Sequence, residues 1–213
     1  MIKTLLLISI ESIVFFITFY MTINVDKDYK DLKIKKKEVI LAVLEVILSG
    51  SIFYQLRADI VYGVFFAFGC GLLLSAAMLD KATTLIPDWI YYLSSLFFGA
   101  IICNGFVQKS GYNLMLIIEL AIFIILQLFV FSRTFGFSDA LAFSVFGLSC
   151  FALSLGWETM MTGMILSYFI LIIVQLFKRN INRKMRLKKP VPFIPYIFAS
   201  YCLTVGFALF LRG

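Results

Sequence analysis

Residues 60–79 read IVYGVFFAFGCGLLLSAAML, a run of 20 residues without a charge that ends directly before Asp80. An α-helix needs about 20 apolar residues to cross the hydrocarbon core of a bilayer. The run therefore predicts a transmembrane helix with a carboxylate at its end. An ionisable group is costly at such a place, which makes Asp80 a candidate for function.

Similar runs fill most of the chain, which has 213 residues, is 62% hydrophobic and has a mean hydropathy of +1.00. We therefore predict an all-α polytopic membrane helix bundle that forms a single domain over residues 1–213. The N-terminal run resembles a signal peptide but has no A-x-A-like cleavage site, so an uncleaved anchor is expected. Eight spans are predicted, at 2–24, 39–56, 60–79, 89–107, 114–131, 140–157, 159–177 and 193–211.

Positive charge is concentrated in two connections, a short loop at 25–38 and a longer one at 178–192. With eight spans, these loops and those with Lys81 and Arg133 fall on one side, which then carries fifteen of the 19 basic residues. The positive-inside rule predicts that this side is cytoplasmic and that both termini are extracytoplasmic. Membrane lipids are expected partners of the basic loops, whereas nucleic acid is not.

Composition excludes several kinds of site. The chain has no histidine, which removes His-based general bases and imidazole metal ligands. Its four cysteines lie far apart inside apolar runs, so we interpret them as small hydrophobic residues in helix packing rather than as zinc or redox pairs. No glycine-rich nucleotide loop is present. We expect neither a cofactor nor a metal, and the oligomeric state stays open.

A second carboxylate follows Gly136-Phe137-Ser138, where Asp139 opens the sixth predicted span on the same side as Asp80. Two carboxyl groups a few ångströms apart in a poorly hydrated site share one proton. The ionised member can then deprotonate a water while the protonated member polarises a carbonyl group. For each aspartate alone, a helix-capping role or contact with interfacial water is the alternative.

The neighbouring residues fit such a site. Pro87 is expected to break the helix between Thr83 and Asp88, and Gly136 with Ser138 allows close approach of a substrate backbone. Asp88, which opens the fourth span, fits a helix cap better than a catalytic group. Three glutamates within apolar spans are expected to face the bundle interior and receive no role: Glu11, Glu45 and Glu119.

Three motifs, in order along residues 60–205, resemble those of type IV prepilin leader peptidases. Asp80 followed by Pro87-Asp88 is similar to the D-x6-P-[DN] element of that family. Gly136-Phe137-Ser138-Asp139 is similar to its GxGD motif. Residues 192–199, PFIPYIFA, are similar to the PFGPFLA-like stretch that opens its last span.

The resemblance implies a membrane-embedded aspartic endopeptidase that removes the basic leader of pilin-like or pseudopilin-like precursors. Its catalytic aspartates would be Asp80 and Asp139, at the cytoplasmic face of a prokaryotic cell membrane. Residues 193–196 are expected to form an irregular segment that lines the cleft and exposes backbone donors; a rigid entry to the last span is the alternative. The substrate-binding residues are predicted to be Pro87, Asp88, Gly136, Ser138, Pro192, Phe193 and Pro195.

The chain also departs from the family pattern. Ser138 replaces the second motif glycine, and Leu141 stands where the family often has lysine. Bifunctional members carry a cytoplasmic, often zinc-binding domain between the first two spans and N-methylate the trimmed pilin. Here only the loop at 25–38 occupies that place, so the chain resembles a minimal form that should not methylate. The alternative function is a non-catalytic assembly factor or an ion- or proton-coupled carrier that uses the paired carboxylates.

Overall fold

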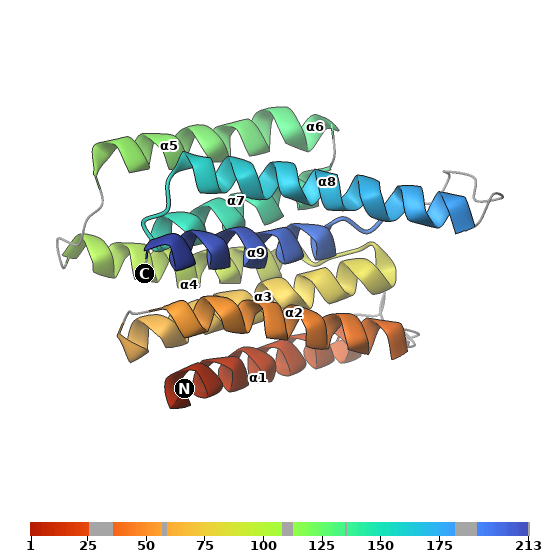
Figure 1. The fold of residues 1–213 in the computed structure, drawn as a ribbon, viewed down its shortest axis with the longest axis horizontal. Coiled ribbons are helices and arrows are strands. Elements are labelled where there is room, and N and C mark those ends of the chain that lie inside the picture. Colours follow the sequence, from red (N-terminus) through yellow and green to blue (C-terminus); the bar gives the residue numbers. More distant parts are fainter. Residues whose placement is uncertain (26–35, 57–58, 108–112, 135, 182–190, 213) are drawn as a thin grey trace.

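The computed structural model describes residues 1–25, 36–56, 59–107, 113–134, 136–181 and 191–212, and they form a bundle of helices that run side by side (Figure 1). The predicted all-α bundle is confirmed. Most of the loops predicted at 25–38 and 178–192 lies outside the described residues. The main helices are α1 (Ile2–Val25), α2 (Lys36–Gln55), α3 (Ile60–Thr83), α4 (Asp88–Val107), α5 (Leu114–Leu126), α7 (Phe137–Ala152), α8 (Trp157–Ile181) and α9 (Ile194–Arg212). The π-helical turn η2 (Gln127–Phe131) continues α5 into the short α6 (Ser132–Thr134).

Length and hydropathy identify the protein as membrane-embedded. Among the described residues, six helical stretches are long and apolar enough to cross a bilayer. Two further apolar helices, Val39–Gln55 and Phe137–Ala152, are shorter. Hydrocarbon offers no hydrogen bonds to the backbone, so helices that satisfy their own N–H and C=O groups are the stable form of such runs.

The sixth predicted span has the wrong boundaries. It was expected at 140–157, but α7 begins at Phe137 and ends at Ala152. Ser154 adopts a positive φ of 56°, and the Leu155 N–H bonds back to the Cys150 carbonyl at 2.8 Å, which closes a turn before α8. The turn is built largely from apolar residues, so hydropathy does not reveal it.

Helix α3 lies inside the bundle, where it packs against α1, α2, α4 and α9. Helix α7 packs against α4, α5, α8 and α9. Because successive long helices along the chain alternate in direction, the end of α3 and the start of α7 lie at the same end of the bundle (right-hand side of Figure 1). At the opposite end, the Tyr62 hydroxyl of α3 donates to the Ala152 carbonyl of α7.

Glu119, which is half-buried, and the four cysteines have defined positions in the bundle. A carboxylate oxygen of Glu119, on α5, accepts the Trp157 N–H at 2.9 Å and thus caps the start of α8. This contact gives Glu119 a structural role. Three of the cysteines are buried as expected for packing residues, whereas Cys103 is exposed on α4.

Candidate active site

Asp80 lies in the last turn of α3 and is 7% exposed. The helix ends because Thr84 adopts a left-handed conformation with φ 61°, and its N–H bonds to the Asp80 carbonyl. The Asp80 side chain reaches the start of α9, where its Oδ2 accepts the Ile194 N–H at 2.8 Å. The Phe193 N–H also donates to this carboxylate. Two backbone donors thus hold one face of Asp80.

Asp139 is half-buried in the first turn of α7. Asp139 is not the N-cap residue itself, because that position belongs to Gly136, three residues earlier. Gly136 has φ 128° and ψ 153°, a conformation that is essentially restricted to glycine. A Cβ atom there would lie 3.8 Å from Asp139 Oδ2, so the carboxylate turns back toward the glycine at the helix entry.

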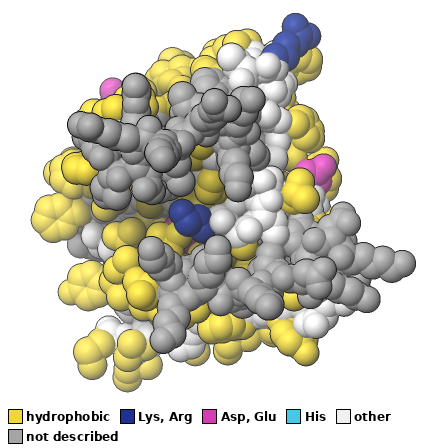
Figure 2. All heavy atoms as spheres, turned by 90° about the vertical axis from the view of Figure 1, so that its right-hand side faces the viewer, with side chains coloured by type: hydrophobic (Ala, Val, Ile, Leu, Met, Phe, Trp, Pro, Cys, Tyr) yellow, Lys and Arg dark blue, Asp and Glu magenta, His cyan; other side chains and the backbone are white. Residues whose placement is uncertain are grey.

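The structure brings Asp80 and Asp139 close enough for their carboxylates to interact electrostatically, although 59 positions separate them in the chain. Helices α4 and α9 each pack against both α3, which carries Asp80, and α7, which carries Asp139. Figure 2 looks onto this end of the bundle and shows a basic side chain near the centre of the face, with hydrophobic side chains beside it.

Tyr91 was not predicted as a site residue, yet it lies among the aspartates. Its hydroxyl lies 3.2 Å from Ser138 Oγ, and it interacts electrostatically with Asp80, Asp139 and Asp88. The contact engages Ser138 within the protein, whereas Ser138 was predicted to serve the substrate backbone. One signal was available in the sequence: Tyr91 follows Asp88 by three residues, which places both on one face of α4.

The stretch 193–196 differs from the predicted irregular segment, because α9 already begins at Ile194. Pro195 fits there, since the first turn of a helix does not need its missing N–H. The Phe193 ring is buried, with centroids 5.9 Å from the Phe143 ring and 5.0 Å from the Tyr168 ring. Its side chain therefore belongs to the core, and its backbone donor is taken by Asp80 rather than exposed to substrate.

The remaining predicted residues lie around the same end of the bundle. Between α3 and α4 the helix is broken, as predicted, with Pro87 half-buried and Asp88 exposed at the start of α4. Pro192 is half-buried just before α9. These three residues lie in or next to the connections between helices at the same end of the bundle as the two aspartates.

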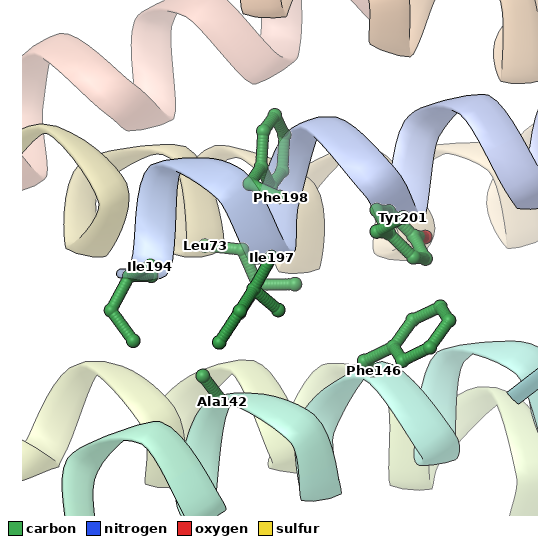
Figure 3. Close-up of a pocket in the computed structure, with 7 residues that line it drawn as sticks. All are labelled: Leu73, Ala142, Phe146, Ile194, Ile197, Phe198 and Tyr201. Atoms are coloured by element: carbon green, nitrogen blue, oxygen red, sulfur yellow. The ribbon is translucent and has the colours of Figure 1, made fainter. Parts of the chain in front are cut away.

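A small apolar cavity lies inside the bundle between α3, α7 and α9 (Figure 3). Ala142 lies three residues after Asp139, and Leu73 lies seven residues before Asp80, which is roughly 10 Å along a helix axis. The Ile194 and Ile197 side chains of α9 point toward α7 across this space, whereas Phe198 points to the other side of α9. Its lining consists of Leu73, Ala142, Phe146, Ile194, Ile197, Phe198 and Tyr201.

The reactive groups at this site are oxygens of two carboxylates and two hydroxyls. Within the described part of the chain, no three His, Cys, Asp or Glu side chains are placed to hold a metal ion together. Comparison of the chain with protein-family models, curated proteins and solved structures finds no match. The function is therefore inferred from the site and its motifs.

Proposed function

We propose that this protein is a membrane-embedded aspartic endopeptidase that removes the leader of type IV pilin-like precursors. One observation carries the proposal: the three motif segments, far apart in sequence, meet at one end of the bundle. Asp80 accepts backbone N–H groups from Phe193 and Ile194, and it interacts electrostatically with Asp139. A helix-capping role for each aspartate separately would not require them to meet.

The pair supplies the groups needed for peptide hydrolysis. Asp80 accepts two backbone donors, which suits the carboxylate member, while Asp139 serves as the carboxylic acid. The carboxylate takes a proton from a water molecule as the water oxygen bonds to the scissile carbonyl carbon. The carboxylic acid meanwhile hydrogen-bonds to the carbonyl oxygen. The proton is then delivered to the amide nitrogen as the C–N bond breaks, leaving a new carboxyl group and a new amine.

The position of the pair also fits the substrate. A precursor of this kind has a basic leader followed by an apolar helix, and the aspartates lie at helix ends rather than at mid-span. The helix would lie in the bilayer beside the enzyme, with the leader in the cytoplasm and the cut at the depth of the carboxylates. This proposal includes the sidedness that the basic loops predict, with the aspartates cytoplasmic.

Co-expression with a candidate precursor tests the assignment. We expect Asp80→Asn and Asp139→Asn each to abolish processing, because an amide can neither accept the water proton nor donate an acid proton. Cleavage is read from the size of the precursor on a gel and from the N-terminus of the product.

Asp88→Asn is the matched control, because Asp88 is exposed and the D-x6-P-[DN] element accepts asparagine at this position. This variant should retain most of the processing activity. Wild-type cleavage by a well-expressed Asp80→Asn or Asp139→Asn protein would refute the proposed dyad.

A further inference from the structure

Two glutamates are buried between α1 and α2, away from the candidate dyad. Glu11 on α1 is 0% exposed and Glu45 on α2 is 1% exposed. Charged side chains in the interior of a membrane protein are expensive and mark functional sites by default. The proposed peptidase mechanism uses neither of them.

The contacts between the helices place the two carboxyl groups together. Ser49 lies one turn after Glu45 on α2, and its hydroxyl donates to Glu11 Oε2 at 2.5 Å. Glu11 therefore faces α2 beside Glu45, and the two glutamates interact electrostatically. Gly71 of α3 lets the helices approach here, because a Cβ on it would lie 2.7 Å from the Glu11 carbonyl oxygen.

Three of the four carboxyl oxygens lack a partner. Glu11 Oε1, Glu45 Oε1 and Glu45 Oε2 are buried and receive no hydrogen bond within the described part of the chain. An ionised carboxylate that is buried without a partner costs several kcal/mol even after the protein relaxes. The Glu45 side chain, which has no hydrogen-bond partner, thus lies beside Glu11, of which only one carboxyl oxygen accepts a hydrogen bond.

The groups that face this pair from other helices do not neutralise it. Cys70 on α3 and Cys202 on α9 are within electrostatic range of Glu11, and Cys202 is also within range of Glu45. The positive group that interacts with Glu45 is Lys81 on α3, which also interacts with Asp80. Within the described part of the chain, the positive group in range of this pair is thus one ammonium that is shared with Asp80.

We propose that Glu11, Glu45 and the Ser49 hydroxyl form a buried site for one small monovalent cation, either a proton or a sodium ion. Carboxylate and hydroxyl oxygens are ligands for hard cations, and a proton satisfies the same charge deficit. A bound cation adds positive charge that Lys81, which is shared with Asp80, does not supply by itself. The site lies between α1, α2 and α3 and is independent of the proposed peptidase activity.

Thermal unfolding of the purified full-length protein in detergent micelles tests this site. A cation that binds only the folded state raises the unfolding temperature with its concentration. For a sodium site, wild type should unfold at higher temperature in NaCl than in choline chloride of equal ionic strength. For a proton site, the salts should act equally, and the unfolding temperature should fall as pH rises from mildly acidic to mildly alkaline.

The variants assign the response to these residues. Glu45→Gln and Glu11→Gln each remove one charge while keeping the side-chain shape, so each should weaken or abolish the wild-type response. Glu119→Gln is the matched control, because that glutamate lies in another apolar helix with a carboxylate oxygen bonded to the Trp157 N–H, and it should respond like wild type.

Two results would overturn the proposal. One is a wild-type protein whose unfolding temperature responds neither to sodium nor to pH, a measurement that needs no variant. The other is a Glu45→Gln or Glu11→Gln protein whose response equals that of wild type. If one variant fails to fold, the other gives the same comparison.

Discussion

At the scale of single residues, the hydroxyl of Tyr91 joins α4 to the entry of α7. It lies 3.2 Å from Ser138 Oγ, one residue before Asp139 in the chain. In the proposed peptidase, this contact helps to orient the first turn of α7 and so the Asp139 carboxylate. Tyr91 acts through Ser138 and is therefore a positioning residue.

We expect Tyr91→Phe and Ser138→Ala each to lower the free energy of unfolding by about 1 kcal/mol, the value of a typical hydrogen bond. Because both remove the same contact, the double variant should lose less than the sum of the two single losses. Denaturant titration of the three variants measures this coupling. Strictly additive losses would show that the two hydroxyls do not interact.

At the scale of helices, the contact between α1 and α3 depends on Gly71. A Cβ atom there would lie 2.7 Å from the Glu11 carbonyl oxygen, a backbone atom that cannot rotate away. Small residues let helices approach closely in membranes, where lipid is as apolar as leucine and packing drives association.

Gly71→Ala should therefore push α1 away from α3 and lower the free energy of unfolding by about 1–3 kcal/mol, the usual cost of overpacking. Gly99→Ala is the control, because a Cβ at that helical glycine meets nothing within 4 Å. Thermal unfolding in detergent should show a loss for the first variant only. Equal unfolding temperatures for the two variants would contradict the close contact.

At the scale of the whole molecule, the aspartates lie near helix ends on one side of the bundle, which in the proposed peptidase would set the depth at which a substrate is cut. A helix rises about 1.5 Å per residue, so each inserted residue moves the scissile bond by that distance relative to the pair.

In the proposed function, moving the cut site by two or three residues along the apolar helix of the precursor should sharply reduce processing. Changes in leader length on the cytoplasmic side should matter less, because that part does not set the depth. A register series of precursors, co-expressed with the wild-type enzyme, measures the effect. Equal cleavage across the series would show that depth in the membrane does not select the scissile bond. It would leave the assignment of Asp80 and Asp139 as the catalytic pair unchanged.

The sequence by itself determined most of the helices and the break at Pro87, but not the turn between α7 and α8. Long apolar runs form helices in lipid because each backbone group must find its partner within the segment. Pro87 predicted the break between α3 and α4, and the spacing of the spans placed Asp80 and Asp139 at one end of the bundle. These signals are local, and residues a few positions apart suffice to create them.

Only the tertiary structure decided which side chains meet. Hydropathy does not record which face of a helix touches a neighbour, since lipid and protein interior are similarly apolar. The backbone donors to Asp80 from Phe193 and Ile194, and the burial of Glu11 beside Glu45, therefore emerge only from helix packing. Each of these contacts joins two different helices, and the shape of the packed surfaces selects the partners.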